Sequence, residues 1–147
     1  MPKRFLFSAI ATIAIAAACG GGGATTPPSS APGSGDATRI EVRLTDSFRI
    51  EPGDFEVPAG EPVTFVVTNA GVLDHEFFVG DEAAQDAHDA EMLSSGGMVH
   101  DEPNGIGVGP GTTKELTITL EAGSTFAGCH VPGHYAGGMK TAITASE

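Results

Sequence analysis

From residue 39 onward the chain is a series of short runs rich in β-branched and aromatic residues, with turn-forming residues between them. Apolar and polar residues alternate in several runs, as at Val63, Phe65 and Val67, which is the pattern of a strand with one buried face. The runs are RIEVRL, DFEVPAG, PVTFVVTN, HEFFV, TTKELTITL, GSTFAGC and MKTAITA. About seven or eight strands at this spacing favour an all-β fold, a β-sandwich.

One segment departs from the β pattern. Residues 81–93, DEAAQDAHDAEML, are rich in Ala, Glu and Gln and contain neither Gly nor Pro, so we predict a helix there. The Gly-rich segment that follows, residues 94–111, is predicted to be a long connection, and connections of this length are usually functional or mobile. The expected fold is therefore a sandwich with one short helix in an insertion.

The first 18 residues predict a lipoprotein signal peptide. Lys3 and Arg4 precede an uncharged apolar run, residues 5–18, which is typical of a secretory signal and short for a transmembrane helix. Three alanines stand directly before Cys19, an arrangement that resembles the lipobox of bacterial lipoproteins, in which the cysteine carries the lipid. We expect Cys19 to anchor the protein to the bacterial cell membrane, in the periplasm or at the cell surface. An ordinary cleaved signal peptide is the alternative.

The segment after the signal is predicted to be a flexible tether. Residues 19–38 are dominated by Gly, Ser, Thr and Pro and contain no large apolar side chain before Arg39, so they have nothing to bury. The remaining residues, 39–147, have the size of one domain.

The charge of the chain limits its partners. Five basic and 19 acidic residues lie after residue 18, a formal charge of −14. Phosphate backbones would be repelled, so nucleic acid is excluded as a partner. An acidic surface is suited to docking a basic protein, although it also serves solubility alone.

Cys129 opens a segment with the composition of a copper ligand loop. The chain reads CHVPGHYAGGM from Cys129 to Met139, which spaces a thiolate, an imidazole and a thioether as Cys-x4-His-x4-Met. These are soft or borderline ligands, suited to copper that alternates between its +1 and +2 states. One loop cannot surround an ion alone, so a second imidazole is expected from His75 in the run HEFFV. The predicted copper ligands are His75, Cys129, His134 and Met139.

This ligand pattern resembles the cupredoxins, the family of plastocyanin and azurin, and its loop is most similar to the rusticyanin type. The resemblance spans residues 39–146 and includes FEVPAGEPVTFVVTNAGVLDHEFFV, which is similar to the strand pair leading into the first histidine ligand. It implies a Greek-key sandwich holding one type 1 copper, with Met139 as the axial ligand. It also implies electron transfer between larger redox proteins, such as a cytochrome or an oxidase, without a small-molecule substrate and without enzymatic activity.

Glu76 departs from the cupredoxin pattern, because many members have Asn or Ser there, hydrogen-bonded to the cysteine-bearing loop. A carboxylate does not donate such a bond unless it is protonated. The loop is also where cupredoxins generally expose their ligand edge, so Val131, Pro132 and Tyr135 are predicted to form an apolar docking rim.

Two enzymatic readings compete with an electron carrier. A hydrolase using Cys129 as nucleophile leaves Met139 without a role and has no identifiable residue to orient a histidine base. The segment also fits the spacing of the last domain of multicopper oxidases, but Gly128 replaces the histidine before the cysteine, and paired His-x-His motifs are absent. His130 is then predicted to be a solvent-facing loop residue.

Copper handling, meaning storage, delivery or resistance, is a second functional hypothesis. His88 and Met92 are four residues apart and share a face of the predicted helix, and Met98 and His100 follow in the Gly-rich segment. These four side chains are candidate ligands of a second copper ion, as Cu(I). Ordinary packing of the two methionines is the alternative.

Overall fold

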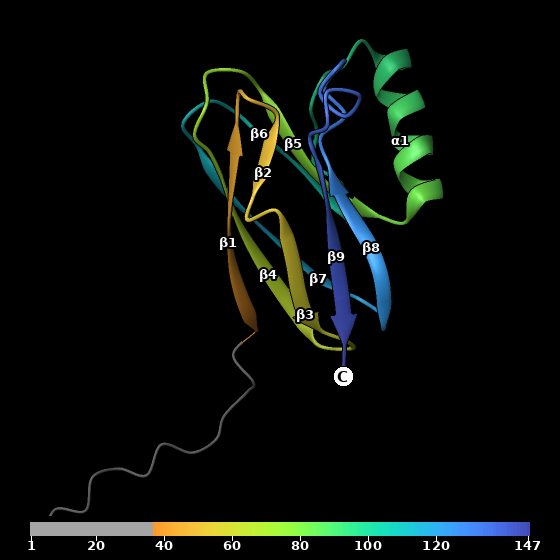
Figure 1. Ribbon diagram of the computed structural model, residues 1–147. Coiled ribbons are helices and arrows are strands. Elements are labelled where there is room, and N and C mark those ends of the chain that lie inside the picture. The colour runs from red at the N-terminus through yellow and green to blue at the C-terminus, as the bar shows by residue number, and fades with distance from the viewer. Residues whose placement is uncertain (1–36) are drawn as a thin grey trace, which may run out of the picture. The chain divides into compact units, whose positions relative to one another are not determined.

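The computed structural model describes residues 37–147, which fold into two facing β-sheets with one helix on the outside (Figure 1). The strands are β1 (Thr38–Thr45), β2 (Arg49–Glu51), β3 (Asp54–Pro58), β4 (Pro62–Asn69), β5 (His75–Gly80), β6 (Gly105–Val108), β7 (Thr113–Thr119), β8 (Gly123–Gly128) and β9 (Lys140–Ser146), and the helix is α1 (Glu82–Ser95). The predicted Greek-key sandwich with one short helix is confirmed. The signal peptide, Cys19 and nearly all of the tether predicted from the sequence lie outside the described residues.

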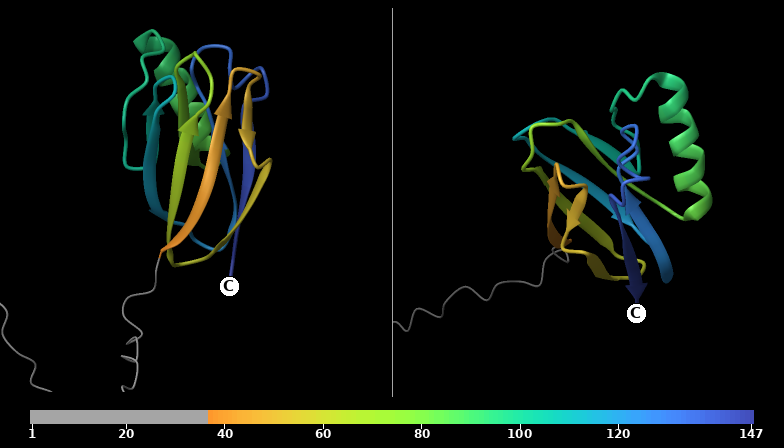
Figure 2. Two further views of the ribbon diagram at one scale, coloured as in Figure 1. Left: turned by 90° about the vertical axis from the view of Figure 1, so that its left-hand side faces the viewer. Right: turned by 45° about the horizontal axis from the view of Figure 1, so that its top comes forward.

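The two sheets have different strand orders. One sheet is ordered β2-β1-β4-β7, with β1 and β4 parallel and the other neighbours antiparallel. The second is ordered β3-β9-β8-β5-β6, with β3 and β9 parallel and the other neighbours antiparallel. The layers face each other in both views of Figure 2. This order makes β5 and β8 neighbours, which decides where the metal ligands meet.

Aromatic side chains join the two layers. Phe65 of β4 and Phe77 of β5 are fully buried, with ring centroids 5.2 Å apart, and Phe55 of β3 packs edge-on against Phe65 at 5.6 Å. The alternation at residues 63, 65 and 67 corresponds to three side chains with no exposed surface. The hydrophobic core therefore includes the first part of β5, where Phe77 lies.

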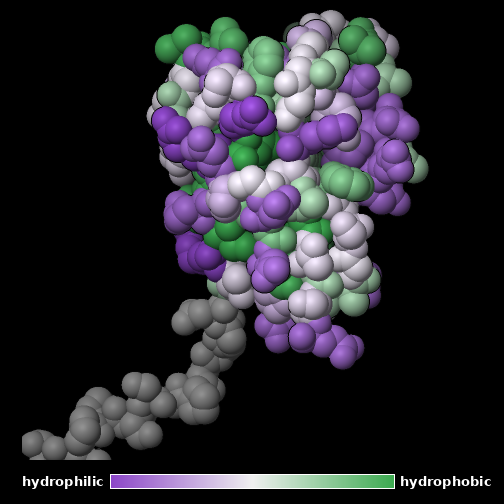
Figure 3. All heavy atoms as spheres, viewed as in Figure 1, coloured by the Kyte–Doolittle hydropathy of each residue, from purple (hydrophilic) through white to green (hydrophobic). Residues whose placement is uncertain are grey.

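The predicted helix is confirmed, two residues longer than expected at its C-terminal end. The Asp81 carboxylate accepts a hydrogen bond from the Ala84 backbone N–H at 2.8 Å and caps the N-terminus. Gly96 ends the helix in the left-handed conformation that glycine adopts readily. Gln85, His88 and Met92 form its buried face, and the outer surface of this region is largely hydrophilic (Figure 3).

The described part contains nine strands, more than the seven or eight predicted. The strand β6 lies inside the Gly-rich segment that we expected to be connection. Its glycines accommodate close neighbours, since a Cβ at Gly105 would lie 2.9 Å from the Phe78 ring and one at Gly107 would lie 2.8 Å from Val99. Within residues 37–147, no helix is long and apolar enough to cross a membrane.

Candidate metal centre

Three of the four predicted ligands meet at one end of the sandwich. His75 begins β5, Cys129 directly follows β8, and the antiparallel pairing of these strands brings the two residues together. His134 lies in the loop before β9. The Nδ1 atoms of His75 and His134 are 3.2 Å apart, and the Cys129 Sγ lies 3.9 and 3.4 Å from them, respectively. All three residues are buried.

These separations suit a metal ion. A point equidistant from the three atoms lies about 2 Å from each, close to the roughly 2.0 to 2.3 Å that bind a first-row metal to imidazole nitrogen and thiolate sulfur. A buried thiolate with two imidazoles is a copper-type donor set. The residues present therefore fit the metal implied by the sequence pattern.

Asp46, in the turn between β1 and β2, orients the first histidine. Its Oδ1 lies 3.2 Å from His75 Nε2, so Nε2 carries the proton and the lone pair of Nδ1 faces the site. The backbone N–H groups of Val72 and Leu73 also donate to this carboxylate, at 2.9 and 3.3 Å, and hold the pKa of Asp46 below its usual value. Sequence reasoning missed Asp46, because no motif links it to a residue 29 positions away.

Phe48 packs on the second histidine, with its ring centroid 4.5 Å from that of His134. Close packing continues at Gly137, where a Cβ would lie 2.7 Å from the Phe48 ring. Burial lowers the pKa of His134, and the neighbouring His75 adds to this effect. The ring therefore favours the neutral form, which is the form that binds metal.

Met139 is fully buried in the hydrophobic core and is tied to both loop ligands through its backbone. Its N–H donates to the His134 carbonyl at 3.0 Å, and its carbonyl accepts from the Cys129 N–H at 3.1 Å. These two backbone hydrogen bonds hold Met139 next to the other two residues of the ligand loop. Axial ligation by the thioether stays a prediction.

The thiol is held in an apolar environment. Burial raises the pKa of Cys129 to about 12, so a metal binding there displaces a proton. The backbone N–H of Glu76 donates to the Sγ at 3.3 Å. The structure thus supplies one hydrogen bond to the sulfur from the strand that carries His75.

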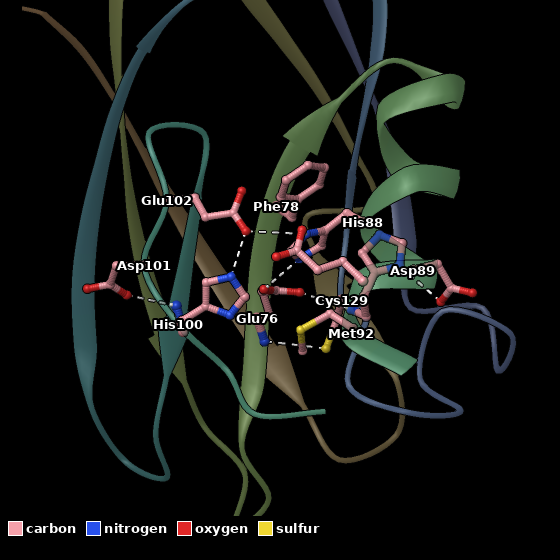
Figure 4. A network of polar contacts seen from close by, with 12 residues as sticks. Glu76, Phe78, His88, Asp89, Met92, His100, Asp101, Glu102 and Cys129 are labelled. Atoms are coloured by element: carbon pink, nitrogen blue, oxygen red, sulfur yellow. Dashed lines mark hydrogen bonds and ion pairs between the residues drawn. The ribbon is translucent and has the colours of Figure 1, made fainter. Parts of the chain in front are cut away.

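Glu76 also contacts the cysteine-bearing loop through its side chain, as an acceptor. Its Oε2 accepts from the His130 backbone N–H at 3.3 Å, and its Oε1 lies 2.9 Å from His88 Nε2 (Figure 4). The residue is 1% exposed. The donor is the loop backbone rather than the side chain of residue 76, so a carboxylate at this position contacts the loop without needing a proton.

We expect Glu76→Gln to raise the reduction potential of the bound copper. The substitution keeps the shape of the side chain but removes a buried negative charge near the thiolate, and that charge favours the more positive, oxidised metal. A rise of tens of millivolts is expected, about 59 mV corresponding to 1.4 kcal/mol in a one-electron couple. Protein-film voltammetry measures it, with the exposed Glu56→Gln on β3 as control. An unchanged or lower potential in Glu76→Gln would contradict this role.

The prediction that His130 faces solvent is wrong, since it is 1% exposed. Successive residues of an extended chain point to opposite faces, so Cys129 points into the sandwich and His130 points outward, where α1 covers it. Its Nε2 lies 2.7 Å from Gln85 Oε1, and its ring stacks on Tyr135 at 4.4 Å. A Cβ at Gly128 would lie 2.6 Å from the same Gln85 oxygen and 2.7 Å from the Tyr135 ring, so a histidine at this position, as in multicopper oxidases, would displace this packing.

The four residues proposed as a second copper site differ in their surroundings. His88 and His100 lie together, with ring centroids 5.8 Å apart. Met92 is fully buried, whereas Met98 is 71% exposed, so the two thioethers lie in different environments. Glu102, which the sequence pattern did not single out, lies between the two histidines (Figure 4).

Comparison with known proteins agrees with this centre. A family model described as "Copper binding proteins, plastocyanin/azurin family" matches residues 37–146. A "Copper-resistant cuproprotein CopI" of Rubrivivax gelatinosus is 36% identical over 110 residues, 71% of this chain and 67% of the relative. The proteins of that name from Pseudomonas aeruginosa and Vibrio cholerae are 36% and 35% identical, covering 71% and 77% of this chain and 74% and 68% of their own lengths.

Solved structures agree in fold. A dithionite-reduced auracyanin from Roseiflexus castenholzii matches with a TM-score of 0.67 and 27% identity, covering 77% of this chain and all of that one. Auracyanin A of Chloroflexus aurantiacus, a "blue" copper protein, matches with a TM-score of 0.62 and 23% identity, over 76% of this chain and all of that one. The family model and the relatives establish that the chain belongs to the plastocyanin/azurin family of copper-binding proteins, the cupredoxins, and that copper is its metal.

Proposed function

We propose that the protein carries single electrons on a copper ion bound by His75, Cys129, His134 and Met139. The observation that carries this proposal is the geometry of the three buried ligand atoms, which the chain itself holds at separations of 3.2 to 3.9 Å. Copper bound there supplies a one-electron couple between its +1 and +2 states.

The surroundings of the ligands favour electron carriage, because they resist movement. Asp46 fixes one imidazole from outside, Phe48 packs on the other, and the Glu76 N–H bonds to the sulfur. Ligands that move little when the metal changes its oxidation state keep the reorganisation energy of electron transfer low. A rigid, buried site is therefore suited to repeated gain and loss of one electron.

The proposed partners are redox proteins, such as a cytochrome or an oxidase, docking at the ligand end of the sandwich. Pro132 of the predicted rim is exposed, while Val131 and Tyr135 are half-buried. Val72 and Leu73, in the loop that leads into His75, add apolar side chains that are 81% and 45% exposed. Exposed apolar residues close to a redox centre are suited to a short-lived protein contact.

We further propose that the protein acts outside the cytoplasm, lipid-anchored through Cys19 and tethered by residues 19–38. The charged start, the apolar run and the alanines before Cys19 support this placement. The acidic domain would then present its copper centre to partners at the membrane surface.

Copper tolerance is the second candidate function, and the three relatives named copper-resistant cuproproteins favour it. In that role the protein would bind or pass on copper rather than relay electrons. The two functions require different behaviour of the same centre, since a carrier retains its metal and a delivery protein releases it.

Redox cycling in the presence of a Cu(I) chelator distinguishes the two functions. We expect the copper-loaded protein, cycled between ascorbate and ferricyanide, to exchange one electron per copper and to keep its metal over many cycles. The measurement combines the absorbance of the copper site with that of the chelator complex. Transfer of copper to the chelator on the first reduction would overturn electron carriage and favour copper delivery.

A further inference from the structure

A second cluster of metal-binding side chains lies beside the helix, away from the three copper ligands. It consists of His88 on α1 with His100 and Glu102 from the connection between α1 and β6 (Figure 4). The Glu102 Oε1 lies 3.3 Å from His88 Nδ1 and 2.7 Å from His100 Nε2. The exposed Glu91 places its Oε2 3.9 Å from the same His88 nitrogen. Both segments thus direct ligand atoms toward one carboxylate oxygen.

The hydrogen bonds of His88 leave its lone pair facing Glu102. Its Nε2 lies 2.9 Å from the Glu76 carboxylate, which only accepts, so Nε2 carries the ring proton. The ring is 3% exposed and stacks on Phe78 with centroids 4.0 Å apart, which fixes its orientation. In the neutral ring, Nδ1 is therefore an unprotonated nitrogen directed at a carboxylate.

His100 has the same arrangement. Its Nδ1 donates to the Met98 carbonyl at 3.1 Å, so its Nε2 presents a lone pair to Glu102. The Glu102 Oε1 itself is buried and has no hydrogen bond of normal geometry. Two nitrogen lone pairs and an unsatisfied carboxylate oxygen repel one another unless a cation lies between them.

The loop that carries these ligands is anchored. The Asp101 carboxylate accepts from the Gly107 N–H at 3.0 Å and from Lys114 Nζ at 2.7 Å. The Glu102 N–H donates to the Gly105 carbonyl at 2.7 Å. The ligand atoms are thus held in place by neighbouring strands, as a pre-formed site requires.

The distances and donor types fit a transition metal. Two ligands bound at about 2 Å and at right angles are about 2.8 Å apart, so separations of 2.7 and 3.3 Å suit neighbouring positions on one ion. Imidazole and carboxylate donors suit divalent ions, and among these Cu(II) binds most tightly in the Irving–Williams order. The ligand atoms of His88, Glu91 and Glu102 all lie within 4.8 Å of one another. We propose that these three residues, with His100 beside Glu102, form a second metal site that takes a divalent transition-metal ion and prefers Cu(II).

This site differs from the thioether site expected from the sequence, because the carboxylate of Glu102 takes the place of Met92 and Met98. It is also connected to the first centre. Glu76 accepts from His88, in the manner of a carboxylate that orients a metal-bound histidine, and its own N–H donates to the Cys129 sulfur. A single residue therefore contacts both sites.

Copper counting tests the proposal. Protein incubated with excess Cu(II) and then desalted is expected to retain two copper ions per chain, measured by inductively coupled plasma mass spectrometry. Glu102→Gln and His100→Ala are each expected to retain one. Electron paramagnetic resonance of the wild type should show a second Cu(II) signal, with nitrogen and oxygen ligands, that both variants lack.

The control is Glu41→Gln, which makes the same change of charge at an exposed position of β1 and should keep both ions. Circular dichroism shows that the variants are folded. The test compares the copper content of each variant with that of the wild type. Its result therefore does not depend on whether the first site carries electrons. One copper in the wild type, or two in Glu102→Gln, would overturn the proposal. Loss of the second ion in Met98→Leu or Met92→Leu, with retention in Glu102→Gln, would overturn it in favour of a thioether site.

Discussion

Replacing Cys129 with Ser is expected to abolish the intense visible absorption of the copper-loaded protein. The band requires charge transfer from a thiolate to Cu(II), and Cys129 supplies the sulfur that lies 3.4 and 3.9 Å from the two imidazole nitrogens. A serine hydroxyl stays protonated and is a hard donor, so it is a poor substitute for binding Cu(I). Loss of this ligand should lower copper affinity by more than the roughly 10- to 100-fold that loss of an outer-shell partner costs.

Absorption and circular dichroism spectra of the copper-loaded variant measure this effect and confirm that the fold is retained. Cys19→Ser is the matched control, because it removes the other cysteine and should leave the band unchanged. A wild-type protein that binds Cu(II) without colour, or a Cys129→Ser variant that keeps the band, would refute a type 1 centre at this position.

Phe77→Ala is expected to cause the largest loss of stability, about 3 to 5 kcal/mol of unfolding free energy. Phe77 has no exposed surface and contacts rings from two other strands, at 5.2 Å from Phe65 and 6.4 Å from Phe55. Truncation would leave a cavity where the two sheets meet. Domains of this size typically have an unfolding free energy of about 5 to 15 kcal/mol, so the variant would lose a large part of its stability.

Urea unfolding of the metal-free protein, followed by circular dichroism, measures this loss without a contribution from bound copper. Val72→Ala, which truncates a side chain that is 81% exposed, should change stability by less than about 0.5 kcal/mol. Phe77 lies on the same strand as the copper ligand His75, two residues after it. The loss of packing at Phe77 should therefore also weaken copper binding. A loss of stability below about 1 kcal/mol would show that the aromatic cluster is not central to the core.

Local patterns were enough to predict the fold class and three converging ligands. Strand alternation and the copper loop are read over a few residues, since side-chain period and ligand spacing are short-range properties. The helix was predicted from its composition, because helix propensity is a property of the individual residues. His75 was placed from its strand and from the resemblance to the cupredoxins, and the structure brings it to Cys129 through the pairing of β5 with β8.

Other features depended on contacts that no local pattern encodes. Asp46 reaches His75 across 29 residues, Glu102 joins two histidines on separate segments, and His130 is covered by α1 and by the ring of Tyr135. Alternation tells which residues share a face of a strand, but not which element covers that face. The three ligands that converge were therefore predictable, whereas the groups that surround them, and the second cluster beside the helix, were decided by how the helix and loops pack on the sheets.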